Sequence, residues 1–438
     1  MLKEHFLISG LAGKKKLTGT VSIPGAKNAA LKAMAASILF KDEVNITNVP
    51  NIEDVSRTAD LLTELGAKVA LRGHSCRIAT NDIHSTDLAS EISKRLRASI
   101  VFAGPLMGRF GKVSFPHPGG CVIGERPIDL FLEGFQKMGA KLSVENEGER
   151  TRYMLRVTGK KLRGTELFFR IQSVTGTETF MMAGVLADGE TIIKNAALEP
   201  EITALAQFLN ACGARIEGAG TTTICVKGGG LLSSRGGKFE IPPDRIDAGS
   251  FLILAALAGK DMEITNCNPA HLESLIDLLR SSGSAVSVGK NYLRVRDIPG
   301  MKNKKPHAIN VKTHEYPGFP TDLQAPLVVY LSQAAGESMV FETIFEGRLN
   351  YTESLRRMGA DIVMMDPHRV IVKGPTALSG KDLESPDLRA GLAFVIAAVI
   401  AKGDSVIHNV YNIDRGYERI EERLRAIGVS IERVSILD

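Results

Sequence analysis

A glycine- and proline-rich segment over residues 118–127 brings a thiol and a guanidinium close together in the sequence. Cys121 follows two glycines, and Arg126 comes five positions later. This density of Gly and Pro indicates a loop. A loop thiol beside a cation can have a lowered pKa and can act as an acid, a base or a nucleophile. Taken alone, the segment fits a cysteine without a chemical role better than a reactive one.

A second set of chemically capable residues stands where six alanine-rich, apolar segments begin. Such segments predict buried helices, and a helix N-terminus carries unpaired N–H groups with a partial positive charge. It is therefore a ready binding site for an anion. The residues at these starts are Lys27 with Asn28, Arg97, 175–178, 244–247, Asp322, and Asp387 with Arg389.

The cations at these helix starts are the most informative residues. A Lys or Arg near a helix N-terminus opposes the helix dipole, at about 0.3–1 kcal/mol each. Lys27, Arg97 and Arg389 repeat this local conflict, and functional sites commonly break local rules. If the helix starts converge, we expect a pocket for phosphates and carboxylates. For Asp322 and Asp387, simple helix capping explains the residue type equally well.

The elements that must position these residues follow a repeat. A helix end, a Gly and then a strand recur six times, at intervals of about 70–76 residues, the size of a small α/β subdomain. Gly suits the left-handed conformation that commonly ends a helix. An amphipathic stretch precedes each copy and predicts a surface helix with one buried face. The glycines are Gly66, Gly139, Gly213, Gly283, Gly359 and Gly428.

Each repeat also contains one apolar helix, so we predict an α/β (α+β) fold of two lobes, with three repeats in each and a cleft between them. A Gly-rich stretch over 228–237 falls midway, which places the N-terminal lobe at 22–235. The C-terminal lobe takes 236–438 together with 1–21, because a strand-like segment precedes the first repeat. The apolar helices are expected over 28–39, 97–107, 177–187, 248–258, 323–335 and 388–401.

Composition excludes several classes of protein. Of the 438 residues, 44% are hydrophobic, Trp is absent and the net charge is only +5. Neither the stacking platforms nor the dense basic face of a nucleic-acid binder is expected. The most apolar stretch, over 391–401, is too short to span a bilayer. The five cysteines are scattered, which predicts no disulfide framework and no metal site. We expect a cytoplasmic protein that binds neither nucleic acid nor membrane.

Several motifs together resemble the enolpyruvyl transferase family, and within it the UDP-N-acetylglucosamine 1-carboxyvinyltransferases. They occur in the family's order across nearly the whole chain. Any one of them is moderately specific, whereas the set is very specific. The motifs cover 22–31, 96–99, 119–130, 173–178, 316–325, 342–346, 387–390 and 414–418.

The resemblance implies a fold and three catalytic residues. The fold is a two-lobe, inside-out α/β barrel, with three βαβαββ subdomains in each lobe and pseudo-threefold symmetry. The N-terminal strand joins the C-terminal lobe. Asp322 is expected to bind and deprotonate a sugar 3′-hydroxyl. Cys121 is expected to act as a general acid and to be the thiol that fosfomycin alkylates. Asp387 is expected near the reacting carbon.

The resemblance also implies a set of substrate-binding residues. Lys27, Arg126 and Arg415 are expected to hold phosphoenolpyruvate, and other side chains to hold the remaining parts of the substrates. These further residues are Asn28, Arg97, Pro127, Ile128, Asp129, Leu130, Arg170, Ser173, Val174, Gly176, Ile344 and Arg389.

The implied reaction moves the enolpyruvyl group of phosphoenolpyruvate to UDP-N-acetylglucosamine, the first committed step of peptidoglycan synthesis. The hydroxyl attacks C2 while C3 is protonated, and a tetrahedral ketal then loses phosphate and a C3 proton. Positioned acids and bases must carry these protons, and fixed cations offset the substrate charges. The expected partners are these two small molecules, and the chemistry requires no metal and no organic cofactor.

Four positions depart from the family pattern. Phe131 stands where a His is usual near the uridine subsite, and Arg170 stands near an expected Lys. Leu198 replaces a common Arg, and Gly347 a common Asn. An enolpyruvyl transferase with another nucleotide or sugar-phosphate acceptor is therefore an alternative. A non-catalytic protein that binds the sugar nucleotide is a further alternative, but it predicts loss of residues such as Cys121, which is present.

Overall fold

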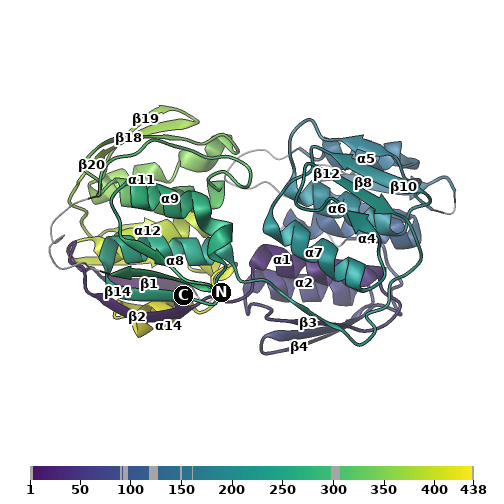
Figure 1. The fold of residues 1–438 in the computed structure, drawn as a ribbon, viewed down its shortest axis with the longest axis horizontal. Coiled ribbons are helices and arrows are strands. Elements are labelled where there is room, and N and C mark those ends of the chain that lie inside the picture. Colours follow the sequence, from purple (N-terminus) through teal and green to yellow (C-terminus); the bar gives the residue numbers. More distant parts are fainter. Residues whose placement is uncertain are drawn as a thin grey trace. The chain divides into compact units, whose positions relative to one another are not determined.

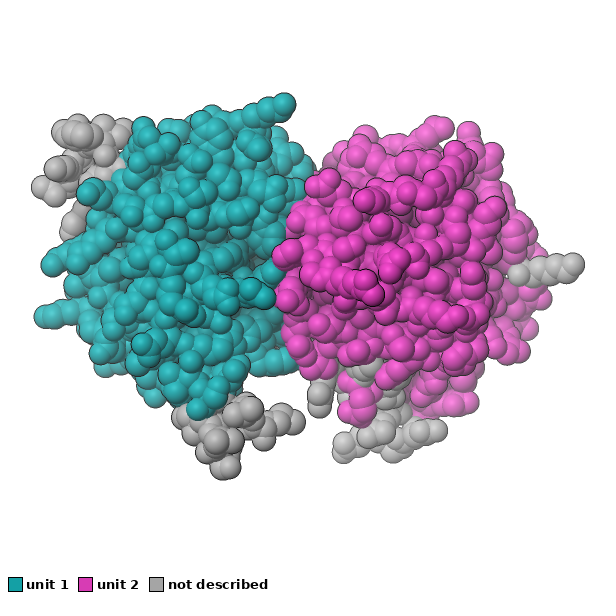
Figure 2. All heavy atoms as spheres, turned by 90° about the horizontal axis from the view of Figure 1, so that it is seen from below, with its two compact units in different colours: residues 1–24, 122–124, 243–438 teal, residues 25–121, 125–242 magenta. Residues whose placement is uncertain are grey.

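The chain divides into two compact units. The computed structural model describes residues 3–88, 91, 97–117, 127–147, 150–159, 161–296 and 306–436. Unit 1 contains residues 1–24, 122–124 and 243–438, and unit 2 contains residues 25–121 and 125–242 (Figure 2). The units therefore change at 24/25 and 242/243, whereas the sequence places these changes at 21/22 and 235/236. Each unit has its own hydrophobic core.

The repeated glycines end six amphipathic helices, as predicted. All six have a positive φ, between 92° and 109°, in the left-handed region where a Cβ would be strained. The mixed α/β class and the number of subdomains expected from this repeat are thus confirmed. The six helices are α2 (Glu53–Glu64), α5 (Asp129–Lys137), α7 (Pro200–Ala211), α9 (Glu273–Ser281), α11 (Thr352–Met358) and α14 (Ile420–Ala426).

Unit 2 contains three sheets among its described residues, and each pairs in the same way. An outer strand runs parallel to its neighbour, and an antiparallel hairpin completes the sheet. In the second sheet, the isolated parallel bridge between Asp87 and Ser114 takes the place of the outer strand. The sheets are β13 (Lys238–Glu240), β3 (Val44–Thr47), β5 (Ser75–Ala79), β4 (Lys68–Arg72); β6 (Lys112–Pro116), β8 (Arg150–Val157), β7 (Ala140–Glu147); and β9 (Glu166–Phe168), β10 (Glu190–Lys194), β12 (Thr223–Lys227), β11 (Ile216–Glu217).

Unit 1 repeats this pairing in three four-stranded sheets. Within a sheet, buried and exposed residues alternate, as in β22 and β10, so one face packs on the core. The sheets are β2 (Leu17–Ser22), β14 (Gly259–Thr265), β16 (Tyr292–Arg296), β15 (Val286–Val288); β17 (Val311–Lys312), β18 (Gly336–Phe341), β20 (Arg369–Gly374), β19 (Asp361–Asp366); and β21 (Asp382–Glu384), β22 (Asp404–His408), β1 (Lys3–Ser9), β23 (Ser430–Ile436).

Two strands depart from the order of the chain. β2 precedes the first subdomain of unit 2 but pairs in parallel with β14 of unit 1. β13 precedes β14 but pairs in parallel with β3 of unit 2. Each unit thus obtains one outer strand from the chain segment that leads into the other unit.

The N-terminal strand completes the last sheet of unit 1. β1 lies between β22 and β23 and is antiparallel to both. In the other sheets of unit 1, the later strand of a hairpin fills this place. The expectation that the first strand belongs with the C-terminal half is therefore confirmed.

Buried helices form the centre of each unit, and the sheets lie outside them (Figure 1). In unit 1, the three buried helices contact one another. The expected helix over 323–335 ends earlier, at Leu331, where a turn leads toward β18. The helices are α1 (Lys27–Ala36) with η1 (Ser37–Leu39), η2 (Arg97–Phe102) with α4 (Ala103–Phe110), and α6 (Val174–Val185) in unit 2, and α8 (Arg245–Ala258), α10 (Gln324–Leu331) and α12 (Leu388–Ile400) in unit 1.

Two further findings concern the described residues alone. None of their helices is long and apolar enough to cross a membrane. Their four cysteines form no disulfide. Burial raises the pKa of the Cys76 thiol to about 12 and that of Cys267 to about 11. Because the thiolate is the reactive form, burial makes these two thiols less reactive.

Candidate active site

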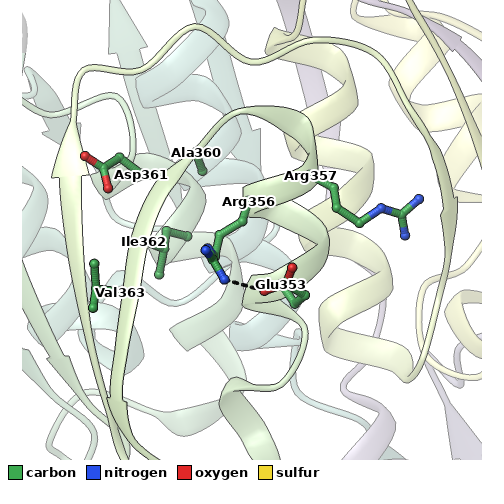
Figure 3. A pocket seen from close by; sticks show the side chains of 7 residues that line it. All are labelled: Glu353, Arg356, Arg357, Ala360, Asp361, Ile362 and Val363. Carbon is green, nitrogen blue, oxygen red and sulfur yellow. Dashed lines mark hydrogen bonds and ion pairs between the residues drawn. The ribbon is translucent and has the colours of Figure 1, made fainter.

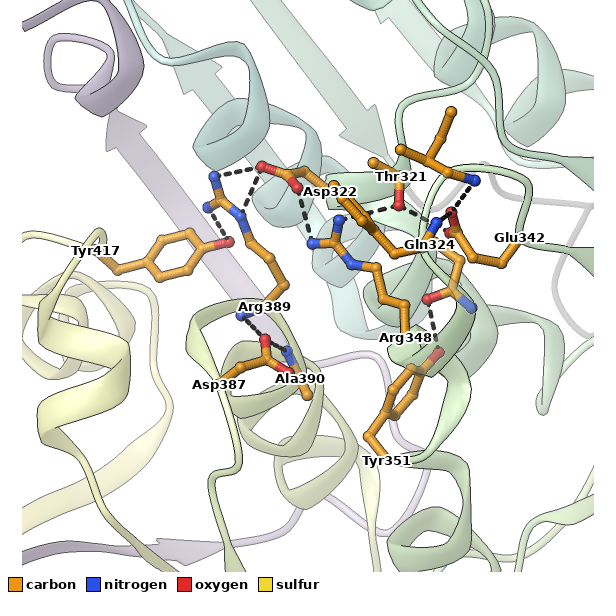
Figure 4. A network of polar contacts seen from close by, with 12 residues as sticks. Thr321, Asp322, Gln324, Glu342, Arg348, Tyr351, Asp387, Arg389, Ala390 and Tyr417 are labelled. Carbon is orange, nitrogen blue, oxygen red and sulfur yellow. Dashed lines mark hydrogen bonds and ion pairs between the residues drawn. The ribbon is translucent and has the colours of Figure 1, made fainter. Parts of the chain in front are cut away.

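Asp322 of unit 1 lies between two arginines (Figure 4). It belongs to the short 3-10 helix η4 (Thr321–Leu323), which leads into the buried helix α10. Arg389, in the first turn of α12, donates to Asp322 Oδ2 from Nε at 3.0 Å and from Nη2 at 2.8 Å. Arg348 donates to the other oxygen, Oδ1, at 2.8 Å. Both carboxylate oxygens are thus held by guanidinium groups.

The electrostatics keep Asp322 ionised. Burial by itself raises the pKa of Asp322, but Arg389 and Arg348 outweigh burial and hold the pKa well below its usual range. The side chain is still 27% exposed, whereas the side chains of Arg348 and Arg389 are 5% and 6% exposed. The carboxylate is therefore the accessible member of this cluster, and the arginines lie behind it.

Arg348 is a site residue that the sequence analysis missed. It lies in η5 (Glu346–Leu349) and donates from Nη1 to Thr321 Oγ1 at 2.9 Å. Thr321 in turn donates to Glu342 at 2.8 Å, and the buried Glu342 also accepts from the Ile344 amide at 2.9 Å. This chain of hydrogen bonds fixes Arg348. It also holds the backbone of Ile344, a predicted substrate contact, through Glu342.

Arg389 has a second partner on the opposite side from Arg348. Its Nη1 donates to the hydroxyl of Tyr417 at 2.9 Å. Tyr417 is 1% exposed, and burial raises its pKa. Asp322, Arg389 and Tyr417 therefore form a continuous network whose members come from three different segments of unit 1 (Figure 4).

Asp387 is a helix cap in the structure. Its Oδ1 accepts from the amides of Arg389 at 2.7 Å and Ala390 at 3.1 Å. The capping alternative thus holds for Asp387, which leaves its other oxygen for further contacts, but not for Asp322, whose side chain caps no helix. Arg415, the other predicted cation of unit 1, ends the short helix α13 (Tyr411–Asp414) and is partly buried.

Lys27 of unit 2 has a carboxylate partner within the protein. Its Nζ lies 2.6 Å from Asp54 Oδ2, and the two side chains are 10% and 2% exposed. Asp54 lies in the first turn of α2. The charge at the start of α1 is therefore offset by a protein carboxylate, just as Arg389 is offset by Asp322. Asn28 follows Lys27 in α1 and is partly buried.

The start of α6 brings together three predicted contact residues. Ser173 caps this helix, and its Oγ accepts from the Gly176 amide at 3.0 Å. A Cβ on Gly176 would lie 2.6 Å from the end of the Leu130 side chain, so a larger residue at this position would displace that side chain. Val174 begins α6 and is partly buried.

The other predicted contacts of unit 2 differ in exposure. Pro127, Asp129 and Arg170 are exposed, and Ile128 is 4% exposed. The side chain of Phe131 is 6% exposed and stacks on Phe180 with a centroid distance of 6.3 Å. The ring of Phe131, which stands where a His is usual, therefore packs in the aromatic core.

A buried charge cluster lies beneath the start of α6. Lys32 Nζ of α1 is 3.1 Å from Glu178 Oε2, and both side chains are buried. Burial raises the pKa of Glu178 to about 7; Lys32 opposes this shift, and Glu201 and Glu199 add to it. Leu198, where the family commonly has Arg, directly precedes Glu199. Lys32 thus supplies a cation to this group of three carboxylates.

Some predicted residues lie outside the described part of the chain. Cys121 and Arg126 are among them, and for Arg97 only the backbone, at the start of η2, is described. Among the described residues, no cluster of His, Cys, Asp and Glu has the composition and spacing to hold a metal ion.

Unit 1 has a surface pocket, and Figure 3 shows the side chains that line it. It has a volume of about 370 Å³ and lies between α11 and β19. Its most prominent contact is the ion pair between Glu353 and Arg356, at 2.7 Å. None of the residues predicted for catalysis or substrate binding lines it. The pocket is lined by Glu353, Arg356, Arg357, Ala360, Asp361, Ile362 and Val363.

The Asp322 cluster has the components of a site for proton transfer beside an anion. A carboxylate can accept a proton when it lies within hydrogen-bond reach of a donor. The guanidinium groups beside it can hold carboxylate or phosphate groups through paired hydrogen bonds. Because these groups are positioned by buried contacts, little reorganisation is needed when charge develops.

Solved structures share this architecture. The enolpyruvyl transferase NikO from Streptomyces tendae aligns with a TM-score of 0.85 at 21% identity, covering 100% of both chains. An EPSP synthase from Acinetobacter baumannii aligns with a TM-score of 0.72 at 18% identity, covering 98% of this chain and 100% of that chain. The fold is thus that of the enolpyruvyl transferases.

Sequence comparison defines the family. The chain belongs to the EPSP synthase (3-phosphoshikimate 1-carboxyvinyltransferase) family, which it matches over residues 11–424. It is 42% identical, over 97% of its length and 99% of the relative's, to a UDP-N-acetylglucosamine 1-carboxyvinyltransferase of Desulforapulum autotrophicum. The protein of the same name from Acidobacterium capsulatum is 44% identical, over 97% and 95% of the two chains.

Proposed function

We propose that this enzyme transfers the enolpyruvyl group of phosphoenolpyruvate to the 3′-hydroxyl of UDP-N-acetylglucosamine and releases phosphate. The observation that carries the proposal is the identity of 42–44% to relatives with this activity in their names, over 97% of the chain. In this reading the protein acts in the cytoplasm, at the first committed step of peptidoglycan synthesis. Its partners are the two small-molecule substrates.

Asp322 is the proposed base for the acceptor hydroxyl. It is the accessible carboxylate of a cluster whose other members are buried cations. With both oxygens held by Arg348 and Arg389, Asp322 is a weak base. Proton transfer from the acceptor hydroxyl becomes more favourable once substrate draws one guanidinium away from Asp322. An incoming carboxylate or phosphate offers that guanidinium an alternative anionic partner.

The reaction then proceeds in two balanced steps. The hydroxyl oxygen bonds to C2 of phosphoenolpyruvate, C3 gains a proton and Asp322 takes the hydroxyl proton, which gives a ketal. The bond between C2 and the phosphate oxygen then breaks, C3 loses a proton, and the enol ether forms. We assign Cys121 as the general acid and Asp387 as a second acidic group near the reacting carbon.

The proposed binding residues are those that the family resemblance implies. Lys27, Arg126 and Arg415 hold phosphoenolpyruvate, with Arg97 and Arg389 as further cations. The start of α6, at Ser173 to Gly176, offers N–H groups and a helix dipole for the diphosphate. The reaction needs neither a metal ion nor an organic cofactor, because fixed cations offset the substrate charges.

Phosphate release from phosphoenolpyruvate tests the proposed function. Purified protein should release phosphate only when UDP-N-acetylglucosamine is present, and fosfomycin should abolish the release. A Cys121→Asp variant should keep activity and resist fosfomycin, because a carboxylic acid can donate a proton but is not readily alkylated. Phosphate release with a different acceptor, and none with this one, would instead establish the alternative acceptor.

A further inference from the structure

Arg433 uses all five of its N–H donors on three carboxylates of unit 1. Nε and Nη2 donate to the two oxygens of Glu421 at 2.9 and 3.2 Å. Nη1 and Nη2 donate to the two oxygens of Asp414 at 2.9 and 2.7 Å. Nη1 also donates to Glu4 at 2.8 Å. The guanidinium has no donor left, and paired bonds of this kind fix orientation as well as distance.

The position of this cluster links four elements. Arg433 lies on β23, Glu4 on β1, Glu421 on α14 and Asp414 at the end of α13. Its guanidinium also lies over the buried Phe6 ring, 5.0 Å from the ring centre. These neighbours raise the pKa of Arg433 and lower that of Glu421, so both remain charged at neutral pH.

The helix that Arg433 holds cannot set its own geometry. α13 has four residues, whereas isolated helices shorter than about 12 residues are marginal in water. Its start is fixed by Asn412, which donates to the backbone oxygen of Ser385 at 2.9 Å. Its end is fixed at Asp414, and the next residue along the chain is Arg415.

We propose that Arg433 is a positioning residue, which clamps Asp414 and thereby sets the place and direction of the adjacent Arg415 for phosphoenolpyruvate. This inference rests on the proposed function, in which Arg415 holds that substrate. Arg433 itself faces three carboxylates and has no donor for a substrate, so it acts through Asp414. A guanidinium is required because an ammonium group lacks the planar arrangement of N–H donors that can form paired hydrogen bonds with two carboxylates at once.

Steady-state kinetics of Arg433→Gln test the inference. Misplacement of a binding group by about 1 Å can reduce a rate about 100-fold. We therefore expect the KM for phosphoenolpyruvate to rise at least about tenfold, with the KM for UDP-N-acetylglucosamine unchanged within about twofold. Arg433→Lys and Asp414→Asn should show the same selective change to a smaller degree. These two variants replace Arg433→Gln in the test if that variant does not fold.

Arg294→Gln is a matched control. Arg294 also lies on a strand of unit 1, bonds both oxygens of Asp261 at 2.8 Å, and is 30% exposed against 22% for Arg433. It is not part of the Asp322 network or of α13. Its variant should leave both KM values unchanged, even if the melting temperature falls.

A double variant separates positioning from general damage. In an Arg415→Lys background, Arg433→Gln should change the KM for phosphoenolpyruvate much less than it does in the wild type, because coupled residues are not additive. Equal changes in both KM values, or full additivity with Arg415→Lys, would overturn the inference. A wild-type protein without transferase activity would instead overturn the proposed function and this inference together, before any variant is made.

Discussion

Arg389 donates two hydrogen bonds to a single oxygen of Asp322, Oδ2, and Arg348 occupies the other oxygen. The residue proposed as a base is thus held in its least basic form. Proton transfer to Asp322 therefore becomes more favourable when substrate gives one of these guanidinium groups another anion to bind.

Asp322→Asn should remove turnover while it preserves binding. An amide cannot take the hydroxyl proton, and general base catalysis commonly contributes about 100- to 10,000-fold. We expect kcat to fall by about that factor, and calorimetry should show the affinity for UDP-N-acetylglucosamine little changed. Asp366→Asn is the control, since it breaks an exposed ion pair with Arg369 in the same unit. Near-normal turnover of Asp322→Asn would exclude a base at this position.

Glu178 should make stability depend on pH. Its pKa is about 7 in the folded protein and about 4.3 in an unfolded chain. The folded state therefore holds the proton more tightly. The stabilisation that comes from this tighter proton binding is fully present below about pH 4.3. It declines as the pH rises and is lost above about pH 7.

Denaturation of Glu178→Gln between pH 5 and 8 would measure this dependence. The amide cannot ionise, so the variant should lose the part of the pH dependence that comes from Glu178, which amounts to about 3–4 kcal/mol at most. Glu166→Gln is a suitable control, because Glu166 forms an exposed ion pair with Lys194 in the same unit. Identical pH profiles for the wild type and Glu178→Gln would show that Glu178 is already ionised near pH 5.

Arg423→Gln should destabilise unit 1. Arg423 donates to the buried Asp247 at 2.6 Å and so ties α14 to α8. Burial raises the pKa of Asp247, and Arg423 opposes that shift. Loss of one partner of a buried pair costs about 3–5 kcal/mol, which urea unfolding would detect. Adding Asp247→Asn should recover part of this loss; if it does not, the stabilising role of Arg423 lies in its packing on Phe251 instead.

Gly134→Ala should destabilise unit 2 although alanine favours helices. The added Cβ would lie 2.1 Å from the ring of Phe180, and that ring is itself packed against Phe135 and Phe169. Overpacking costs about 1–3 kcal/mol, which exceeds the gain of about 1 kcal/mol in helix propensity. Gly159→Ala is the control for thermal unfolding, because a Cβ there meets no atom within 4 Å.

The repeat was predictable because each copy carries its own local signal. A glycine at a helix end needs only its neighbours to adopt a positive φ, so six similar phrases predicted six similar subdomains. The exchange of β2 and β13 was not predictable in this way. A short strand has no local feature that specifies which of two similar sheet edges it will join. The pairing depends on distant residues, 244 positions apart for Thr265 and Val21 and 193 for Asn48 and Ile241.

The site was predictable in its residue types but not in its contacts. Asp322 and Asp387 both stand at helix starts, yet only Asp387 is a cap. The difference arises from arginines 26 and 67 positions away from Asp322, which no local pattern reveals. Arg348 and Arg433 were missed for a similar reason, since the carboxylate partners of each lie on other elements, at least 12 positions away.

The position of β1 has a consequence for how the protein is made. Glu4 and Arg433, which meet across β1 and β23, are 429 positions apart, and a ribosome adds about 5–20 residues per second. Unit 2 is nearly continuous in the chain and can fold while synthesis continues. The first strand must stay unpaired for about 20–80 seconds until its partners emerge. During that time Phe6 and Ile8, which are fully buried in the folded protein, have no core to pack against.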